Sequence, residues 1–260
     1  MTMRTGFAEG EVCWTDLQTR DVEAAKIFYS AVFGWRYEDL PTPDGRSYSQ
    51  AFLDDALVTV IAPQNPQQQA ARLDGQWNVY FSVGDAQELA AEVTSAGGTL
   101  EFGPEAVNDT GVMVFFAPPG GGATGAWQAG SHFGTAQRQD PGTLGWAELL
   151  TPEPQAAVGF FQQLFGHEVT EYPQDDGGTY TTLLVNGTEV AGIAPLPADA
   201  DVPLKAGWQV YFRVSNVADA VDAAVTAGAV VVVEPEDLEE AGVVATLKDP
   251  QGGVFSLLEA

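Results

Sequence analysis

The stretch WTDLQTRDVEAAKIFYSAVFGW, residues 14–35, has a second copy in the chain, WAELLTPEPQAAVGFFQQLFGH, residues 146–167, at an offset of 132. Two further anchors follow in the same order. WNVYFSV (77–83) matches WQVYFRV (208–214) at an offset of 131, and APPGG (117–121) matches DPQGG (249–253) at 132. Three agreeing anchors indicate an internal duplication. We therefore predict a first domain at 1–130, a polar, glycine-containing linker at 131–142 and a second domain at 143–260.

Each copy is predicted to contain two units, and each unit is a strand and a helix followed by three short strands. Val12–Leu17 alternates as a strand does, Asp21–Phe33 has apolar residues at helical spacing, and Gly34 is the expected helix end. The remaining predicted elements of the first copy are strands at 35–38, 48–53 and 57–61, a loop at 63–69, a strand at 77–83, a helix at 85–96 and short strands up to Trp127. This order predicts a mixed α+β fold rather than a doubly wound parallel sheet.

Composition narrows the class of protein and of partner. Among 260 residues, 36 are Asp or Glu and 10 are Lys or Arg, which gives a net charge of −26. A chain this acidic repels phosphate backbones and anionic lipid, so we expect no nucleic-acid and no membrane partner. The single cysteine, Cys13, excludes an intramolecular disulfide and a zinc ribbon. Because no apolar run resembles a membrane span or a signal peptide, we expect a soluble, cytoplasmic protein.

These features resemble the vicinal oxygen chelate superfamily, which includes glyoxalase I, bleomycin- and fosfomycin-resistance proteins and extradiol dioxygenases. The resemblance rests on the helix with Asp21, Phe28, Tyr29 and FGW at 33–35, on its second copy, and on DPQGG at 249–253. It covers essentially the whole chain. The WQ at 127–128 and a linker containing His132 look most like a two-domain actinobacterial, glyoxalase-like branch. The resemblance implies four βαβββ modules in two tandem domains. Each domain would curl into a half-open sheet with the ligand on its concave face, or cup, and helices on its convex face.

Alternation along the strands assigns side chains to the two faces. In the first strand of each copy the residues expected to face the cup are Trp14 and Asp16, then Trp146 and Glu148. Cys13 is expected on the helix side, buried and inert. The tryptophans could equally be core residues. The acids could be general bases facing a ligand, or could be held by a structural partner, with Arg213 as a neighbour for Glu148. The other expected ligand-binding residues are Asn78, Tyr80 and Trp127 in the first cup, and Gln209, Tyr211 and Arg213 in the second.

Metal ligands are missing where the family has them. In metal-dependent relatives His, Glu or Gln side chains on the strands of two modules hold the metal. The resemblance maps these positions to Trp14, Asn78 and Thr124 or Gly125, and to Trp146, Gln209 and Ser256. Transition metals require imidazole, thiolate or carboxylate donors. We therefore predict no metal and no other cofactor, and we do not carry over glyoxalase or dioxygenase chemistry. GGGATG at 120–125 leads into a strand and is predicted to be a turn rather than a phosphate loop.

Three hypotheses for function remain open. The first is a glyoxalase/bleomycin-resistance-like protein that binds a small organic metabolite or antibiotic in aromatic-lined cups without a metal. The second is a metal-free lyase, isomerase or cyclase with Asp16 or Glu148 as general base. The third is a metal-dependent lyase or dioxygenase. Because the second cup is the more polar one, we expect it to take the more oxygenated ligand. The chain is expected to be a monomer with pseudo-twofold symmetry or a homodimer.

Overall fold

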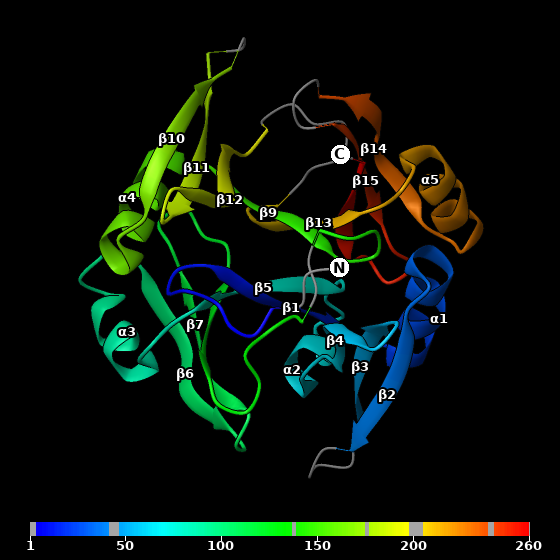
Figure 1. The fold of residues 1–260 in the computed structure, drawn as a ribbon, viewed down its shortest axis with the longest axis horizontal. Coiled ribbons are helices and arrows are strands. Elements are labelled where there is room, and N and C mark those ends of the chain that lie inside the picture. The colour runs from blue at the N-terminus through cyan, green and yellow to red at the C-terminus, as the bar shows by residue number, and fades with distance from the viewer. Residues whose placement is uncertain are drawn as a thin grey trace.

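The computed structural model describes residues 4–41, 47–136, 139–174, 177–197, 205–238 and 242–259. Within these ranges each repeat forms one eight-stranded sheet with its longer helices packed on one face (Figure 1). The first repeat contains β1 (Val12–Thr19), α1 (Val22–Phe33), β2 (Arg36–Pro41), β3 (Ser47–Leu53), β4 (Ala56–Pro63), α2 (Pro66–Ala70), β5 (Gln76–Ser82), α3 (Ala86–Glu92), β6 (Thr99–Val107), β7 (Gly111–Ala117) and β8 (Thr124–Ala129). The second contains β9 (Leu144–Thr151), α4 (Pro154–Phe165), β10 (Glu168–Pro173), β11 (Thr179–Val185), β12 (Thr188–Pro195), β13 (Gly207–Arg213), α5 (Val217–Thr226), β14 (Val230–Asp237), β15 (Val243–Lys248) and β16 (Val254–Glu259). The predicted α+β class is confirmed.

The two sheets share one topology. The strand order is β2-β3-β4-β1-β5-β8-β7-β6 in the first and β10-β11-β12-β9-β13-β16-β15-β14 in the second. β1 pairs in parallel with β4 and antiparallel with β5, and β5 pairs in parallel with β8. β9, β12, β13 and β16 repeat this pattern. Each sheet is therefore two βαβββ modules joined through a central antiparallel pair, β1/β5 or β9/β13.

The helix ends follow from local sequence. Asp21 caps α1 by accepting a hydrogen bond from the backbone N–H of Ala24 at 3.0 Å. Gly34 and Gly166 end α1 and α4 with φ of 72° and 70°, a left-handed conformation that glycine adopts without strain. The predicted loop at 63–69 contains the short helix α2, because Asn65 and Gln68 cap each other reciprocally. No helix in the described ranges is long and apolar enough to span a membrane.

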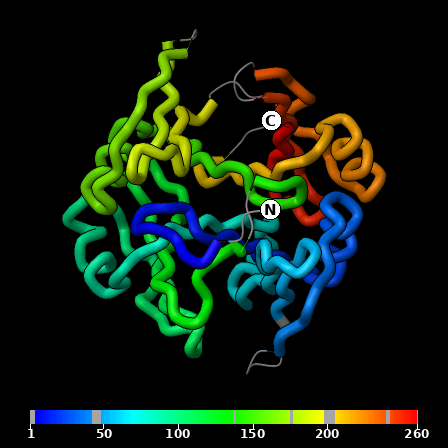
Figure 2. Tube along the Cα trace, in the orientation of Figure 1, coloured from blue at the N-terminus to red at the C-terminus, as the bar shows by residue number. Residues whose placement is uncertain are grey.

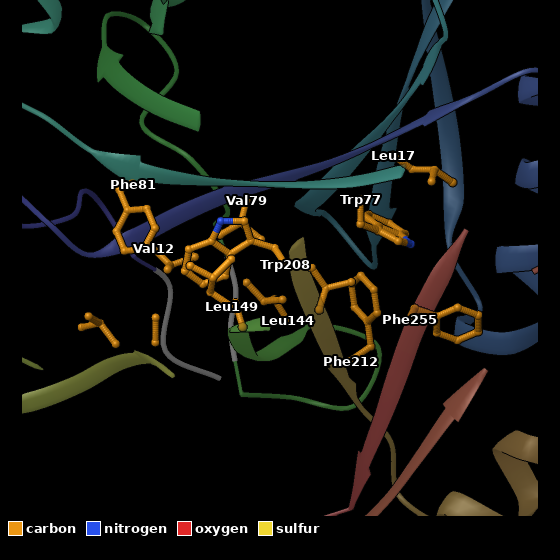
Figure 3. Packing of buried hydrophobic residues seen from close by; sticks show 14 of the residues in the cluster. Val12, Leu17, Trp77, Val79, Phe81, Leu144, Leu149, Trp208, Phe212 and Phe255 are labelled. Atoms are coloured by element: carbon orange, nitrogen blue, oxygen red, sulfur yellow. The ribbon is translucent and has the colours of Figure 1, made fainter. Parts of the chain in front are cut away.

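The two repeats share one aromatic core between their sheets. α1 of the first repeat lies beside α5 of the second, and α3 lies beside α4 (Figures 1 and 2). Side chains of β5 and β13 meet between the sheets (Figure 3). Phe212, on β13, has ring centroids of the first repeat 4.9–5.4 Å away, those of Phe33, Trp35 and Trp77. Phe81, on β5, is surrounded in the same way by Phe161, Phe165 and Trp208. The repeats are thus packed back to back.

A matched pair of hydrogen bonds joins the repeats across the pseudo-twofold relation. Trp35 donates from Nε1 to the carbonyl oxygen of Gly142 at 2.8 Å. His167, which lies 132 residues after Trp35, pairs through Nε2 with the carbonyl oxygen of Gly10 at 2.8 Å. Gly10 and Gly142 are also 132 residues apart and precede β1 and β9. Each repeat therefore anchors the chain segment that leads into the central strand of the other.

The glycine loops at 118–122 and 249–253 are contacts between the repeats. A Cβ atom on Gly122 would lie 2.5 Å from the side chain of Leu149, and one on Gly75 would lie 3.2 Å from the backbone nitrogen of Gly253. Gln251 accepts hydrogen bonds from the Thr19 hydroxyl and the Asp21 N–H, each at 2.7 Å. The glycines permit close approach of two backbones. The segment predicted as a turn, 120–125, contains the end of a turn at Gly120, but its last two residues belong to β8, which begins at Thr124.

We expect Phe212→Ala to lower the free energy of unfolding by about 3–5 kcal/mol, because a buried ring of the second repeat that packs against three aromatic rings of the first is lost. Both repeats should unfold in one transition at the lower denaturant concentration. The matched control is Phe102→Ala, whose ring is 49% exposed and whose effect should stay within about 0.5 kcal/mol. Denaturation followed by tryptophan fluorescence and circular dichroism measures both. Two separate transitions, one of them unchanged, would contradict a shared core.

His167 should make stability depend on pH. Burial lowers its pKa below the ordinary value of 6.5, so folding disfavours protonation of the ring. Below that value the unfolded chain takes up a proton that the folded chain does not, and stability falls as pH falls, by at most about 1.4 kcal/mol per pH unit. His167→Gln should remove this contribution, so the stability difference between wild type and variant should shrink on acidification. A difference that is constant with pH would refute the assignment.

Candidate functional site

The outward faces of the two sheets carry the residues expected in the cups. In cup 1, the concave face of the first sheet, Trp14 lies opposite Tyr80 and Asp16 lies opposite Asn78 on β1 and β5. In cup 2, the concave face of the second sheet, Trp146 lies opposite Tyr211 and Glu148 lies opposite Gln209 on β9 and β13. Strand alternation therefore brought together an acid, an aromatic residue and an amide at the centre of each sheet.

Asp16 is held by two neighbours on β5. Its Oδ1 accepts a hydrogen bond from Asn78 Nδ2 at 2.7 Å, and its Oδ2 accepts one from the Tyr80 hydroxyl at 2.5 Å. Burial raises the pKa of Asp16, and the two hydrogen bonds oppose this rise. Both carboxylate oxygens are thus engaged by protein groups.

A hydrophobic cluster fills the floor of cup 1. Its buried members are Cys13, Trp14, Val60, Tyr80 and Trp127, with Tyr48, Met113 and Phe115 packed against them. Cys13 was expected on the helix side, and this was wrong. A β-bulge between Val12 and Trp14 shifts the register, so that Cys13 joins the cup cluster and donates from Sγ to the carbonyl oxygen of Tyr80 at 3.5 Å. Cys13 is buried, as expected.

The start of the linker lies against cup 1. The ring of His132 packs edge-on against Trp14 with centroids 4.5 Å apart, and Trp127 donates from Nε1 to the His132 carbonyl oxygen at 2.8 Å. Thr135 and Ala136 continue along the cup by donating backbone hydrogen bonds to Cys13 and Leu57. Burial lowers the pKa of His132 to about 4, so this ring is neutral at physiological pH. Nothing in the sequence of the linker had indicated this contact.

Cup 2 has a polar network in place of that cluster. Glu148 Oε1 accepts a hydrogen bond from the Tyr211 hydroxyl at 2.5 Å. Burial raises the pKa of Glu148, whereas hydrogen bonds from Tyr211 and Tyr180 lower it. The Tyr180 hydroxyl in turn accepts a hydrogen bond from Trp146 Nε1 at 2.8 Å. On the neighbouring strands the hydroxyls of Thr246 and Ser256 are 2.9 Å apart.

Tyr180 was missed from the sequence, although a signal exists. It is the repeat equivalent of Tyr48, at an offset of 132. Cup 1 has Val60 where cup 2 has Gly192, and a Cβ atom on Gly192 would lie only 2.1 Å from the Tyr180 hydroxyl oxygen. The change from valine to glycine admits the Tyr180 hydroxyl to the centre of cup 2.

The remaining polar residues of cup 2 differ in their role. Arg213 was expected beside Glu148, but it donates from Nε to Gln139 of the linker at 2.6 Å, and the neighbours that shift the pKa of Glu148 are tyrosines. Gln209 is 7% exposed, and its buried Oε1 accepts no hydrogen bond from any residue in the described part of the chain. An unpaired buried amide oxygen is unfavourable unless a ligand or a rotation of the amide supplies a donor.

The two cups therefore differ in polarity and access. Trp14 and Tyr80 are buried, whereas their equivalents Trp146 and Tyr211 are partly exposed. Across the described ranges, no three His, Cys, Asp or Glu side chains come together in a group that could hold a metal ion. Cup 2 combines accessible aromatic surface with a carboxylate and several hydroxyls, the composition of a site for an oxygenated organic molecule.

Each repeat matches a known domain family. Residues 12–123 match the domain family described as the glyoxalase/bleomycin resistance protein/dioxygenase superfamily, and residues 146–258 match the family described as a glyoxalase-like domain. CFP32 of Mycobacterium tuberculosis, provisionally named a glyoxylase, is 36% identical over 100% of this chain and 98% of its own length. DnrV of Streptomyces peucetius, named an anthracycline biosynthesis protein, is 33% identical over 98% of this chain and 95% of its own length.

Solved structures share the fold at low sequence identity. An Mn(II)-bound glyoxalase from Novosphingobium aromaticivorans is 16% identical with a TM-score of 0.65, over 96% of this chain and 81% of that one. The 2,3-dioxygenase LapB from Pseudomonas sp. KL28 is 16% identical with a TM-score of 0.66, over 96% and 93%. The duplicated sheets, the matched families and the full-length relatives lead to one conclusion. The chain belongs to the glyoxalase/bleomycin resistance protein/dioxygenase, or vicinal oxygen chelate, superfamily and carries two of its domains in tandem.

Proposed function

We propose that this protein binds a small, planar, oxygenated organic molecule in cup 2 and that it does so without a resident metal. The observation that carries the proposal is the network of Trp146, Tyr180, Glu148 and Tyr211, which is hydrogen-bonded and yet partly exposed on the concave face. Trp146 offers a flat surface for stacking. The carboxylate and the tyrosine hydroxyls offer acceptors and donors for ligand oxygens.

Cup 1 supports this choice by contrast. Its tryptophans are 6–7% exposed, whereas Trp146 and Tyr211 in cup 2 are partly exposed. His132 packs on Trp14 at the position where a ligand ring would stack. We infer that cup 1 is the structural copy and that cup 2 is the working one.

The class of ligand gains support from the relatives. DauV of Streptomyces sp. strain C5 and DnrV are both named anthracycline biosynthesis proteins, and this chain spans 95% of each. Anthracyclines are planar, hydroxylated polycyclic molecules, and such a ring system suits an aromatic wall with a few polar groups. An unrelated metabolite of the same shape and polarity would meet the same requirements.

The donor set of the cups does not fit a transition metal. By the resemblance, the strand positions that hold the metal in the superfamily correspond here to Trp14, Asn78 and Thr124 or Gly125, and to Trp146, Gln209 and Ser256. The central strand pair of each cup, all of whose residues the structure describes, contributes one carboxylate, which is hydrogen-bonded to a tyrosine hydroxyl. A stable site would need several imidazole, thiolate or carboxylate donors. We therefore derive no chemical step through a metal.

A second candidate function is metal-free proton transfer, with Glu148 as general base in a lyase, isomerase or cyclase. The observation that favours it is the raised pKa of Glu148, caused by burial, because a base is more effective when its pKa approaches the working pH. Asp16 has a raised pKa for the same reason but lies in the covered cup. Turnover of a bound ligand that disappears in Glu148→Gln while binding persists would favour this candidate.

Substitutions of the two acids test which cup works. Glu148→Gln should weaken binding of quinizarin, a dihydroxylated anthraquinone, by at least about tenfold, the scale of one lost hydrogen bond to a charged group. Asp16→Asn is the matched control in cup 1 and should leave affinity unchanged. Calorimetric titration measures affinity, and thermal melts on the same samples report folding. Intact affinity in Glu148→Gln together with a lower melting temperature would show that this acid is only structural.

Elemental analysis tests the metal-free site. Protein purified without chelators should contain well under one Zn, Ni, Fe or Mn per chain, because the cups lack a donor set that would retain these ions. Quinizarin affinity should also be unaffected by chelator treatment. Stoichiometric metal that survives purification would overturn this part of the proposal and would favour a metal-dependent lyase or dioxygenase.

A further inference from the structure

A cavity of about 310 Å³ opens where the two repeats meet at the starts of β5 and β13. One wall is the segment from Leu73 to Trp77 of the first repeat, and another is the segment from Lys205 to Gln209 of the second. The second repeat also contributes Lys248, at the end of β15, and Val254, at the start of β16, to the cavity lining. The cavity is thus built by both copies of the duplicated domain.

The cavity adjoins cup 2 through shared strands. Gln209 lines the cavity and is also the cross-strand partner of Glu148. Lys248 follows Thr246 by two residues on β15, so both side chains lie on the same face, about 7 Å apart along the strand. Thr246 contacts Ser256, which is the cross-strand partner of Tyr211. The cavity and cup 2 therefore share Gln209, and Lys248 lies on the strand face that carries Thr246.

The charge of the cavity lining is opposite in sign to that of the protein. The whole chain has a net charge of −26 and contains only three lysines, and two of these, Lys205 and Lys248, line this one cavity. Asp74 is the single acid in the lining, and Lys205 lies 3.8 Å from it. Lys248 has no ion-pair partner in the described ranges of the chain, and it is only partly exposed. A positive amine beside an otherwise anionic surface attracts a small anion.

We infer that the cavity receives a carboxylate of the ligand, so that the protein selects planar, hydroxylated aromatic acids over their neutral counterparts; this inference rests on the proposed binding function. Lys248 is the main partner of the carboxylate, and Lys205, being largely exposed, adds a weaker attraction. Gln209 assists because its buried Oε1 accepts no hydrogen bond from the described residues, and the amide also carries an N–H donor that suits a carboxylate.

The probes are 3-hydroxy-2-naphthoic acid and its methyl ester, which share one ring system and differ in charge. Titration calorimetry on the full chain should show the acid binding at least about tenfold more tightly than the ester, the scale of one charge-assisted hydrogen bond. Lys248→Gln should abolish this preference by weakening the acid alone, whereas Lys248→Arg should retain it. Lys26→Gln is the control, since it changes the net charge equally. Lys26 lies on α1 and pairs with Glu23 of the same helix and Asp39 of β2.

The possible results distinguish a failure of carboxylate selection from a failure of ligand binding in cup 2. Equal affinity of wild type for acid and ester, or equal loss of both in Lys248→Gln, would overturn carboxylate selection while binding in cup 2 stands. Glu148→Gln should weaken both probes, because the carboxyl group of Glu148 lies in the shared part of the site. Failure of wild type to bind either probe would overturn the proposed function and the inference together.

Discussion

The aromatic core between the two sheets determines which faces of the central strands point outward and form the cups. Phe212 inserts among aromatic rings of the first repeat and Phe81 among those of the second, and these residues belong to one continuous buried cluster. Because the inner faces of β5 and β13 are committed to this core, the opposite faces must point outward, and these are the faces that form the cups. The Trp35–Gly142 and His167–Gly10 hydrogen bonds then fix where β1 and β9 begin.

The duplication made most of the fold predictable. The offset of 132 residues, the capped helices and the alternating strands were enough to predict four modules and the α+β class, and alternation assigned the faces of the central strands except at Cys13. The same alternation brought Trp14, Asp16, Trp146 and Glu148 to the cups. The face on which a strand residue lies is a local property, because side chains alternate with a period of two residues. It can be predicted without knowing which segments pack against the strand.

The parts that could not be predicted depend on contacts between distant segments. The bulge at Cys13 reverses one side chain, and alternation alone does not reveal it. The contact of His132 with Trp14 and the pairing of Arg213 with Gln139 both involve a polar linker without periodicity. Tyr180 enters cup 2 because Gly192, on another strand, leaves space for it. In each case a neighbour remote in sequence determines the position.

Duplication also explains how two similar cups can differ in structure. Both retain an acid bonded to a tyrosine hydroxyl, but the linker covers one cup while a glycine opens the other to an additional hydroxyl. The most direct test of this account is a crystal structure of the full chain with quinizarin. The account predicts the ring system on Trp146 in cup 2, with a ligand oxygen within hydrogen-bond distance of Glu148 or Tyr211. A ligand between Trp14 and Trp127 in cup 1, with cup 2 empty, would contradict it.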